Sequence, residues 1–269
     1  MRRWLLLLLV LLLALLSPPG AVPAGAHPRV VLAAVPIGRT DLPWWRDRFA
    51  AKAAELRRVH PELVFYGDSI TQDWERAGPQ PWANFRPVWK HYYGGRRAVD
   101  LGFIGDTTAS LIWRIDHGEA SGIAPRVAVV LIGANDMGAP HWNAAETTAG
   151  IAEVLRLLHA HLPRTRILLL AVLPSDRSAW ITRTTHRINR ILAARYGKGR
   201  VSYVTFLDLN RLFYRHGKLD LALFLDPHLH PPAPPLHPTA AAQAAMAAAM
   251  EPVLARLLGD RPRPPMAVP

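Results

Sequence analysis

The sequence predicts a single α/β domain with a parallel sheet of five strands at its centre. Five short apolar runs rich in Val, Ile and Leu recur along the chain, and none alternates strictly with polar residues. Continuous apolar runs of this length are typical of strands that are covered on both faces. Segments with helical character lie between the runs, which indicates βαβ units with right-handed crossovers. At 269 residues the chain has room for one large domain, and it contains no internal repeat.

The expected elements follow each other in a regular order. Strands are predicted at 62–66, 97–101, 127–132, 167–172 and 201–206. Helices are predicted near 44–58, 81–92, 107–116, 144–161, 178–195 and 239–257. We therefore divide the chain into an N-terminal extension with the first helix at 27–58, a main domain at 59–259, and a proline-rich tail at 260–269 that we expect to be disordered.

The first 26 residues have the layout of a secretory signal peptide. A short positive start at 1–3 precedes an unbroken apolar run at 4–16, and Ala24-Gly25-Ala26 supplies a small-x-small cleavage pattern. The apolar run is shorter than the roughly 20 residues that a membrane span needs. We expect residues 1–26 to be cleaved and the protein to be secreted or periplasmic, without stable membrane insertion afterwards. An uncleaved N-terminal anchor is the alternative.

The charge and the cysteine count limit the partners that the sequence predicts. The formal net charge is +12, with 32 Lys and Arg against 20 Asp and Glu. The arginines are scattered and never run longer than two in a row, which is not the pattern of a nucleic-acid-binding stripe. There is no cysteine, so disulfides and thiolate metal sites are excluded. We predict no nucleic-acid partner, and the sequence does not indicate an oligomeric state.

Polar and glycine-rich segments follow three of the predicted strands. Gly67-Asp68-Ser69 comes after the first strand, 102–107 after the second and 133–136 after the third, and a His/Pro-rich loop at 226–238 precedes the last helix. In open α/β sheets, ligands lie at the carboxyl ends of the strands. We therefore expect these four segments to meet at one edge of the sheet.

The residue types in these segments suit acyl transfer. A serine such as Ser69 becomes a good nucleophile only when a base takes its proton. The oxygen that becomes negative at the tetrahedral stage needs hydrogen-bond donors aimed at it. Ser69 at a helix start gains from the helix dipole, Gly105 allows close approach, and Asn135 carries a side-chain NH₂. The alternative for Ser69 is an ordinary turn or capping serine.

Taken together, the blocks resemble the SGNH/GDSL hydrolase family. Gly67-Asp68-Ser69, the G-x-x-G-D-T-T block at 102–108, the G-x-N-D block at 133–136 and a late His-Pro stand in the family's order. The stretches "LGFIGDTTASLIWRIDHGE" and "PRVAVVLIGAND" are similar to the platelet-activating-factor acetylhydrolase-like branch. The resemblance covers residues 60–258. It implies a three-layer α/β/α flavodoxin-like sandwich, makes 59–259 an SGNH hydrolase domain, and implies no cofactor.

The resemblance also implies roles for individual residues. Ser69 is the nucleophile, and the oxyanion hole consists of the Ser69 N–H, the Gly105 N–H and the Asn135 side chain. "LHPTAAAQAAMAAAMEPVL" resembles the family's histidine block, which points to His237 as the base. The residues expected to support the site are Asp68, Gly102, Asp106, Gly133 and Asp136. Of these, Asp68 and Asp136 are expected to fix loops through backbone N–H groups, and Asp106 with Thr107 to form a helix N-cap.

The sequence departs from the family at the catalytic acid. The family places this acid three residues before the histidine, where Pro234 stands here. We predict Asp226, the nearest upstream acid, in this role, because the proline-stiffened loop can fold it back onto His237. Asp226 can instead pair with His230 or cap a turn, which would leave a Ser-His dyad helped by a backbone carbonyl. The histidines of the loop lack the spacing of a metal site, so no metal is predicted.

These observations predict an exported serine esterase of the GDSL/SGNH type. The expected substrate is a short acyl ester, with acetyl as the acyl group, carried by a small molecule, a carbohydrate or a lipid. No G-x-S-x-G elbow or Walker A loop is present, which argues against other hydrolase and NTPase classes. Two alternatives stay open: a polysaccharide O-acetyltransferase that uses the same site, and a non-catalytic glycan-binding protein that has lost its acid.

Overall fold

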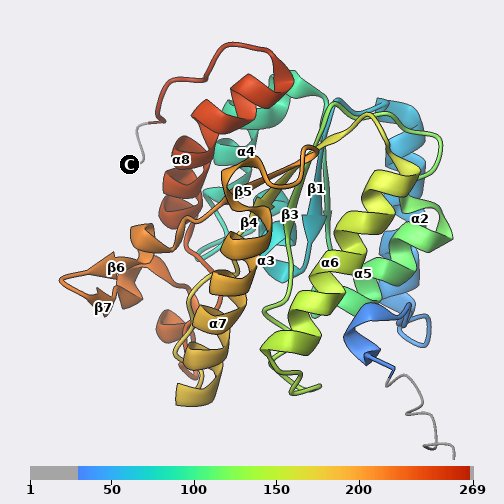
Figure 1. Ribbon diagram of the computed structural model, residues 1–269. Coiled ribbons are helices and arrows are strands. Elements are labelled where there is room, and N and C mark those ends of the chain that lie inside the picture. The colour runs from blue at the N-terminus through green and yellow to red at the C-terminus, as the bar shows by residue number, and fades with distance from the viewer. Residues whose placement is uncertain (1–29, 267–269) are drawn as a thin grey trace, which may run out of the picture. The chain divides into compact units, whose positions relative to one another are not determined.

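A parallel sheet of five strands runs through the centre of the molecule (Figure 1). The computed structural model describes residues 30–266, so the predicted signal peptide lies outside the described residues. The strand order is β2-β1-β3-β4-β5. The strands are β1 (Leu63–Gly67), β2 (Ala98–Gly102), β3 (Val127–Leu131), β4 (Arg166–Leu170) and β5 (Val204–Leu207). The prediction of a central parallel five-stranded sheet is confirmed.

Helices cover both faces of this sheet and complete the three layers. α5, α6 and α7 pack side by side in chain order, and α4 packs against α8 on the other side (Figure 1). The helices are α2 (Pro43–Val59), α3 (Ser69–Gln72), α4 (Phe85–Tyr93), α5 (Thr108–Arg114), α6 (Ala144–His161), α7 (Ala179–Tyr196) and α8 (Ala240–Leu258). Since both faces are covered, every residue of β1 and β3 is buried.

The register of the three inner strands sets the position of the site. Gly67 at the end of β1 pairs with Gly102 at the end of β2 and with Leu131 at the end of β3. These strands therefore end at the same level, and the chain leaves all three at one edge. The segments that follow them thus start side by side, as the sequence predicts.

Side-chain caps determine where the long helices begin. Asn143 accepts the backbone N–H groups of Ala145 and Glu146, and the Glu146 side chain accepts the Asn143 N–H, which completes a capping box for α6. Thr239 caps α8 in the simpler way, through the N–H of Ala242. Both helices begin within one residue of their predicted starts.

Several boundaries differ from the prediction because local turns intervene. α4 begins at Phe85 and not near 81, since the preceding segment contains a turn in which the Trp82 N–H donates to Pro79 O. β5 begins at Val204 and not at 201, because the Val204 N–H closes a turn onto Val201 O. The helix start predicted at Ser69 is confirmed by the short helix α3, whereas a small hairpin of β6 (Tyr214–Arg215) and β7 (Lys218–Leu219) is not predicted from the sequence.

The described parts of the two flanking segments form contacts with the rest of the protein. In the segment 27–58, Ala33 O accepts a hydrogen bond from Thr108 Oγ1, and Trp45 is fully buried. At the other end, residues 260–266 differ from the predicted disordered tail: the Arg263 N–H donates to the Glu251 carboxylate, and the next contacts reach α4. Residues 31–58 and 260–266 therefore pack against the main domain.

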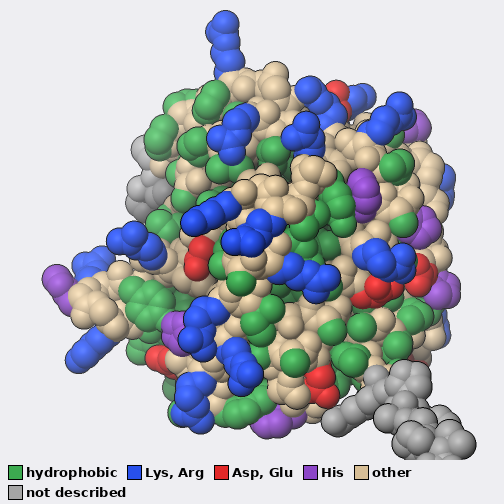
Figure 2. Space-filling model, in the orientation of Figure 1, with side chains coloured by type: hydrophobic (Ala, Val, Ile, Leu, Met, Phe, Trp, Pro, Cys, Tyr) green, Lys and Arg blue, Asp and Glu red, His purple; other side chains and the backbone are tan. Residues whose placement is uncertain are grey.

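The positive charge is spread over the surface. Lys and Arg side chains are scattered across the face shown in Figure 2 and do not form one continuous stripe. This distribution follows from the scattered arginines of the sequence. Within residues 30–266, no helix is both long and apolar enough to cross a membrane.

Candidate active site

Ser69 lies at a tight turn from β1 into α3. Asp68 is the N-cap of this short helix, and its Oδ1 accepts the Ile70 N–H at 2.9 Å. The turn needs glycine before it, because a Cβ on Gly67 would lie 2.0 Å from Thr71 Oγ1 and 2.5 Å from Leu131 O. The Gly-Asp-Ser sequence therefore holds the serine at the carboxyl edge of the sheet, directly after β1.

Ser69, His237 and Asp226 form a continuous chain of side-chain hydrogen bonds. Ser69 Oγ lies 2.9 Å from His237 Nε2, and His237 Nδ1 lies 2.6 Å from Asp226 Oδ1. The second carboxylate oxygen, Oδ2, accepts the backbone N–H groups of Leu236 at 2.7 Å and of His237 at 2.6 Å. The structure thus brings together the serine, the histidine and the acid named from the sequence.

The loop between the acid and the histidine folds back on itself. The Ala233 N–H donates to Asp226 O at 2.9 Å, and the Leu225 N–H donates to His237 O at 2.8 Å. These bonds close the proline-rich segment, so two residues separated by 11 positions lie side by side. Asp226 therefore pairs with His237 and not with His230, the alternative left open by the sequence.

Each partner of this pair changes the pKa of the other. Burial lowers the pKa of His237, but the hydrogen bond to Asp226 and its negative charge outweigh burial and leave the pKa above its usual value. Burial raises the pKa of Asp226, but the hydrogen bonds from His237 and Leu236 outweigh it and leave this pKa below the usual range. Asp226 is thus ionised at neutral pH and orients the imidazole.

The donors expected for the oxyanion hole come from three neighbouring segments. Gly105 has φ +75°, a conformation that favours glycine, and within the described residues neither its N–H nor that of Ser69 donates to a protein acceptor. Asn135 Nδ2 donates to Asp106 O at 3.0 Å. Because an amide NH₂ has two hydrogens, Asn135 keeps one donor for a ligand.

Gly102 and Gly133 provide the close approaches that bring these segments together. A Cβ on Gly102 would lie 2.1 Å from the Gln72 N atom and 2.7 Å from Asp68 O, so only glycine lets the second loop rest on the start of α3. Gly133 has φ +117°, which an L side chain rarely adopts. Both supporting glycines of the prediction thus occupy positions where a side chain would displace a donor.

Two aspartates of the sequence motifs, Asp68 and Asp136, hold loops in place, as predicted. Asp136 accepts the Thr108 N–H at 2.9 Å and the Thr108 hydroxyl at 2.7 Å, and burial raises its pKa to about 6. Burial likewise raises the pKa of Asp68 to about 7. Each binds backbone next to the site, so each holds a loop in place.

Asp106 has a different role from the predicted helix cap. Thr107 alone caps α5, through the Ser110 N–H. Asp106 is fully buried, accepts Trp45 Nε1 at 2.8 Å and forms an ion pair with Arg114 Nε at 2.8 Å. The helix N-cap predicted at Asp106-Thr107 is thus present and is formed by Thr107, while the Asp106 carboxylate binds donors from the N-terminal segment and from α5.

Arg114 extends this ion pair into a buried network under the site. Its side chain is fully buried, and it also pairs with Glu119. Its terminal nitrogens donate to Leu101 O and to Gly67 O, each at 3.1 Å. The guanidinium therefore ties the ends of β1 and β2 to the loop that carries Gly105.

A second arginine, which the sequence analysis missed, joins the histidine loop to the asparagine loop. Ser175 Oγ donates to Pro235 O at 2.7 Å, and Arg177 Nε donates to Ser175 Oγ at 3.1 Å. Arg177 Nη2 donates to Ala134 O at 2.7 Å, directly before Asn135. The only sequence signal for Arg177 is its place after the fourth strand, at the same edge of the sheet.

A serine bonded through histidine to aspartate, beside free backbone amides, is the arrangement of enzymes that transfer acyl groups through a serine. Within residues 30–266, no group of three or more His, Cys, Asp or Glu side chains is placed to hold a metal ion. The sequence profile of the GDSL-like Lipase/Acylhydrolase family matches residues 65–245, and the chain belongs to this family. This membership places it among the GDSL/SGNH acylhydrolases.

Named relatives support the same family. The chain is 27% identical over 151 residues to "Platelet-activating factor acetylhydrolase IB subunit alpha1" of Bos taurus. It is 26% identical over 183 residues to subunit alpha2 of the same enzyme from Rattus norvegicus. The matches cover 56% and 66% of this chain and 60% and 73% of those subunits. The alignment thus spans less than two thirds of the bovine subunit.

Solved structures share the fold at low sequence identity. A GDSL-like lipase from Bacteroides thetaiotaomicron superposes with a TM-score of 0.59 at 18% identity, covering 78% of this chain and 97% of that one. A carbohydrate esterase family 3 structure from Talaromyces cellulolyticus gives a TM-score of 0.55 at 17% identity, covering 74% and 98%. These likenesses confirm the predicted flavodoxin-like sandwich of this hydrolase class.

Proposed function

We propose that this protein is an exported serine esterase that hydrolyses short acyl esters, with acetyl as the acyl group, on a small-molecule, carbohydrate or lipid alcohol. The observation that carries the proposal is the unbroken chain of contacts from Ser69 through His237 to Asp226. This chain gives the serine a base and gives the base an orienting acid, which are the two requirements of an activated serine.

The reaction proceeds in two halves. In the first, Ser69 Oγ attacks the ester carbonyl carbon while His237 Nε2 takes the hydroxyl proton. The tetrahedral intermediate then breaks its bond to the alcohol oxygen, and His237 returns the proton to the leaving alcohol. In the second half, His237 takes a proton from water, which attacks the acyl-enzyme. Cleavage of the Ser69 ester bond releases the carboxylic acid and restores the serine hydroxyl.

The oxyanion of both tetrahedral stages is stabilised by fixed donors. The free N–H groups of Ser69 and Gly105 and the second Asn135 hydrogen are available for it. Their frame is held by buried ion pairs, so little reorganisation is needed when charge develops on the oxygen. Preorganised donors of this kind are the largest single contribution to many acyl transfers.

The acyl group and the export are inferred from relatives and from the N-terminal segment. Two kinds of similar proteins are named for removing acetyl groups: the acetylhydrolase subunits and a carbohydrate acetylesterase family member from Sinorhizobium meliloti. Acetyl esters are therefore the first substrates to test. The signal-like residues 1–26 support release from the cytoplasm.

The test is hydrolysis of p-nitrophenyl acetate, butyrate and octanoate by the purified protein. We expect kcat/KM to fall as the acyl chain lengthens, and Ser69→Ala to lower kcat by roughly 10⁴- to 10⁶-fold. Ser121→Ala is the matched control, since Ser121 is exposed and away from the site, and it should retain full activity. Equal activity in the wild type and in Ser69→Ala would contradict the proposal.

A further inference from the structure

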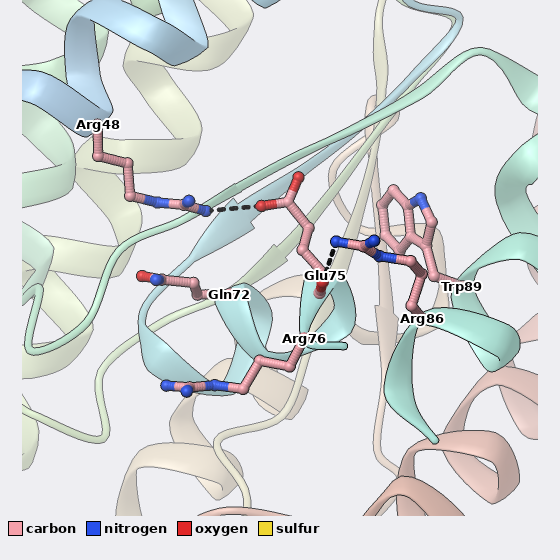
Figure 3. A pocket seen from close by; sticks show the side chains of 6 residues that line it. All are labelled: Arg48, Gln72, Glu75, Arg76, Arg86 and Trp89. Atoms are coloured by element: carbon pink, nitrogen blue, oxygen red, sulfur yellow. Dashed lines mark hydrogen bonds and ion pairs between the residues drawn. The ribbon is translucent and has the colours of Figure 1, made fainter. Parts of the chain in front are cut away.

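A pocket of about 510 Å³ lies between α2, α3 and α4, outside the chain of catalytic contacts (Figure 3). Its walls carry arginines and planar polar side chains together with one indole. The lining residues are Arg48, Gln72, Glu75, Arg76, Arg86 and Trp89. Three guanidinium groups thus line one pocket.

The pocket borders the loop that carries the oxyanion donor Gly105. Gln72 Oε1 accepts the Ile104 N–H at 2.9 Å, one residue before Gly105. Arg48 Nε donates to Gly102 O at 2.8 Å, at the start of the same loop. Two residues that line the pocket, Arg48 and Gln72, therefore also support this loop.

The pocket residue Arg76 is linked to the catalytic histidine through the charge of one carboxylate. Arg76 forms an ion pair with the buried Asp73, and the negative charge of Asp73 acts on His237. The pocket therefore borders α3, the short helix that begins with Ser69 and ends with the lining residue Gln72.

The acceptors in the pocket are already occupied. The Glu75 carboxylate has a cation on each oxygen, Arg48 on Oε2 at 3.1 Å and Lys52 on Oε1. The Gln72 carbonyl oxygen is bound by the Ile104 N–H. Figure 3 shows the Glu75 side chain extended toward Arg48. A ligand therefore finds few free acceptors among the lining residues.

The donors, in contrast, are largely unused. Within residues 30–266, the Gln72 NH₂ and both terminal nitrogens of Arg76 have no hydrogen-bond partner. The Arg86 side chain makes a single hydrogen bond, from Nη2 to Glu75 O at 3.3 Å, and no Asp or Glu of the described residues forms an ion pair with it. The free hydrogen-bonding capacity of the pocket is thus almost purely of the donor type and carries an uncompensated positive charge at Arg86.

We infer that this pocket is a subsite for an anionic group, phosphate, sulfate or carboxylate, carried on the alcohol part of the ester substrate. An oxyanion accepts only, and its oxygens match the forked donors of guanidinium groups. Trp89, packed on Phe65 with ring centroids 5.1 Å apart, forms a rigid apolar wall for the carbon skeleton that bears the anion. The inference rests on the proposed function, because it assigns the substrate of the same serine.

The test uses two pairs of acetyl esters that differ in charge. One pair is 1,2-diacetylglycerol 3-phosphate and triacetin, and the other is an acetylated oligogalacturonate with free or with methylated carboxylates. The measured quantity is the ratio of kcat/KM for the charged and the neutral member of each pair. We expect this ratio to exceed one for the wild type in at least one pair and to decrease as NaCl is added. The pair whose charged member is preferred shows whether the anionic group belongs to a glycerophosphate or to an acidic sugar.

Two variants assign this preference to the pocket. Arg86→Gln should lower the charge ratio roughly tenfold or more, since one charge-assisted hydrogen bond to the ligand is lost. Lys90→Gln removes the same charge from an exposed position one turn further along α4, outside the pocket, and should leave the ratio within about twofold. Because the ratio is taken within one variant, a general loss of active protein cancels.

The outcomes separate this inference from the proposed function. A ratio near one in the wild type, no hydrolysis of either pair, or equal decreases in the Arg86→Gln and Lys90→Gln variants would reject the anionic subsite. If p-nitrophenyl acetate is still cleaved in a Ser69-dependent manner, only the subsite has failed. If that cleavage is absent as well, the esterase proposal has failed with it.

Discussion

The serine side and the histidine side of the site are built in opposite ways. On the serine side, Asp106, Arg114 and Glu119 are fully buried and bind one another directly under the loop of Gly105. On the histidine side, most of the segment 228–234 is exposed, and its shape depends on a few backbone hydrogen bonds and on Asp226.

Because of this difference, we expect substitutions on the two sides to affect different properties of the protein, its stability and its activity. Removing one partner of a buried ion pair leaves an uncompensated charge in the interior, which strongly lowers the free energy of unfolding. A half-exposed loop can lose a contact while the rest of the domain stays folded, because loops open locally at low cost. We therefore expect changes on the serine side to affect folding and changes on the histidine side to affect mainly catalysis.

The largest effect expected from the comparison of the two sides is the loss of activity in Asp226→Asn. The amide cannot hold His237 in the tautomer that accepts the Ser69 proton, so kcat should fall by roughly 10³- to 10⁴-fold. The free energy of unfolding should fall by only about 1 kcal/mol, since the amide oxygen still accepts the backbone N–H groups of Leu236 and His237.

Esterase kinetics together with urea denaturation check both parts of this prediction. Asp208→Asn, an acid of the C-terminal half that does not contact His237, is the matched control and should keep its activity. Activity within tenfold of the wild type in Asp226→Asn would mean that a Ser-His dyad suffices, and the comparison of the two sides would lose its basis.

Next in size is the loss of stability in Arg114→Met. The variant leaves Glu119 without an ion-pair partner in the interior and takes the buried one of two arginines from Asp106, which keeps Arg39, so the free energy of unfolding should fall by about 3–5 kcal/mol. The exposed ion pair of Arg97 with Glu62 offers the control: Arg97→Met should cost less than about 1 kcal/mol. Urea denaturation measures both values. Similar losses in the two variants would show that the buried network is not the source of stability on this side.

A smaller effect on the serine side is expected from Asn135→Ala. Removing one oxyanion donor should lower kcat by about 10²- to 10³-fold with little change in KM, because the bond strengthens only as negative charge develops. Asn84→Ala is the control, since Asn84 is exposed and its side chain makes no capping bond. A rise in KM at constant kcat would instead make Asn135 a residue that binds the ground state.

The sequence predicted the serine side of the site better than its support. Ser69, Gly105 and Asn135 stand in short motifs at strand ends, where the position along the strand already determines the edge of the sheet. The partners of Asp106 could not be read in this way, because Trp45 and Arg114 reach it through tertiary packing. The pairing of Asp226 with His237 depends on how a proline-rich loop closes, which an interval of 11 residues does not determine.

The smallest effect, and the sharpest probe of the histidine side, is the pH dependence of kcat/KM. Only neutral His237 can accept the Ser69 proton, so activity rises as the imidazole loses its proton. Because Asp226 holds the pKa of His237 above its usual value, half-maximal activity in the wild type should lie above about pH 6.5. In Asp226→Asn this carboxylate is absent and burial of the ring remains, so the residual activity should reach half its maximum at a lower pH. Rate profiles between pH 5 and 9 with p-nitrophenyl acetate measure both midpoints. Coincident midpoints would mean that Asp226 orients the imidazole without stabilising its charge, and the histidine side would then depend on geometry alone.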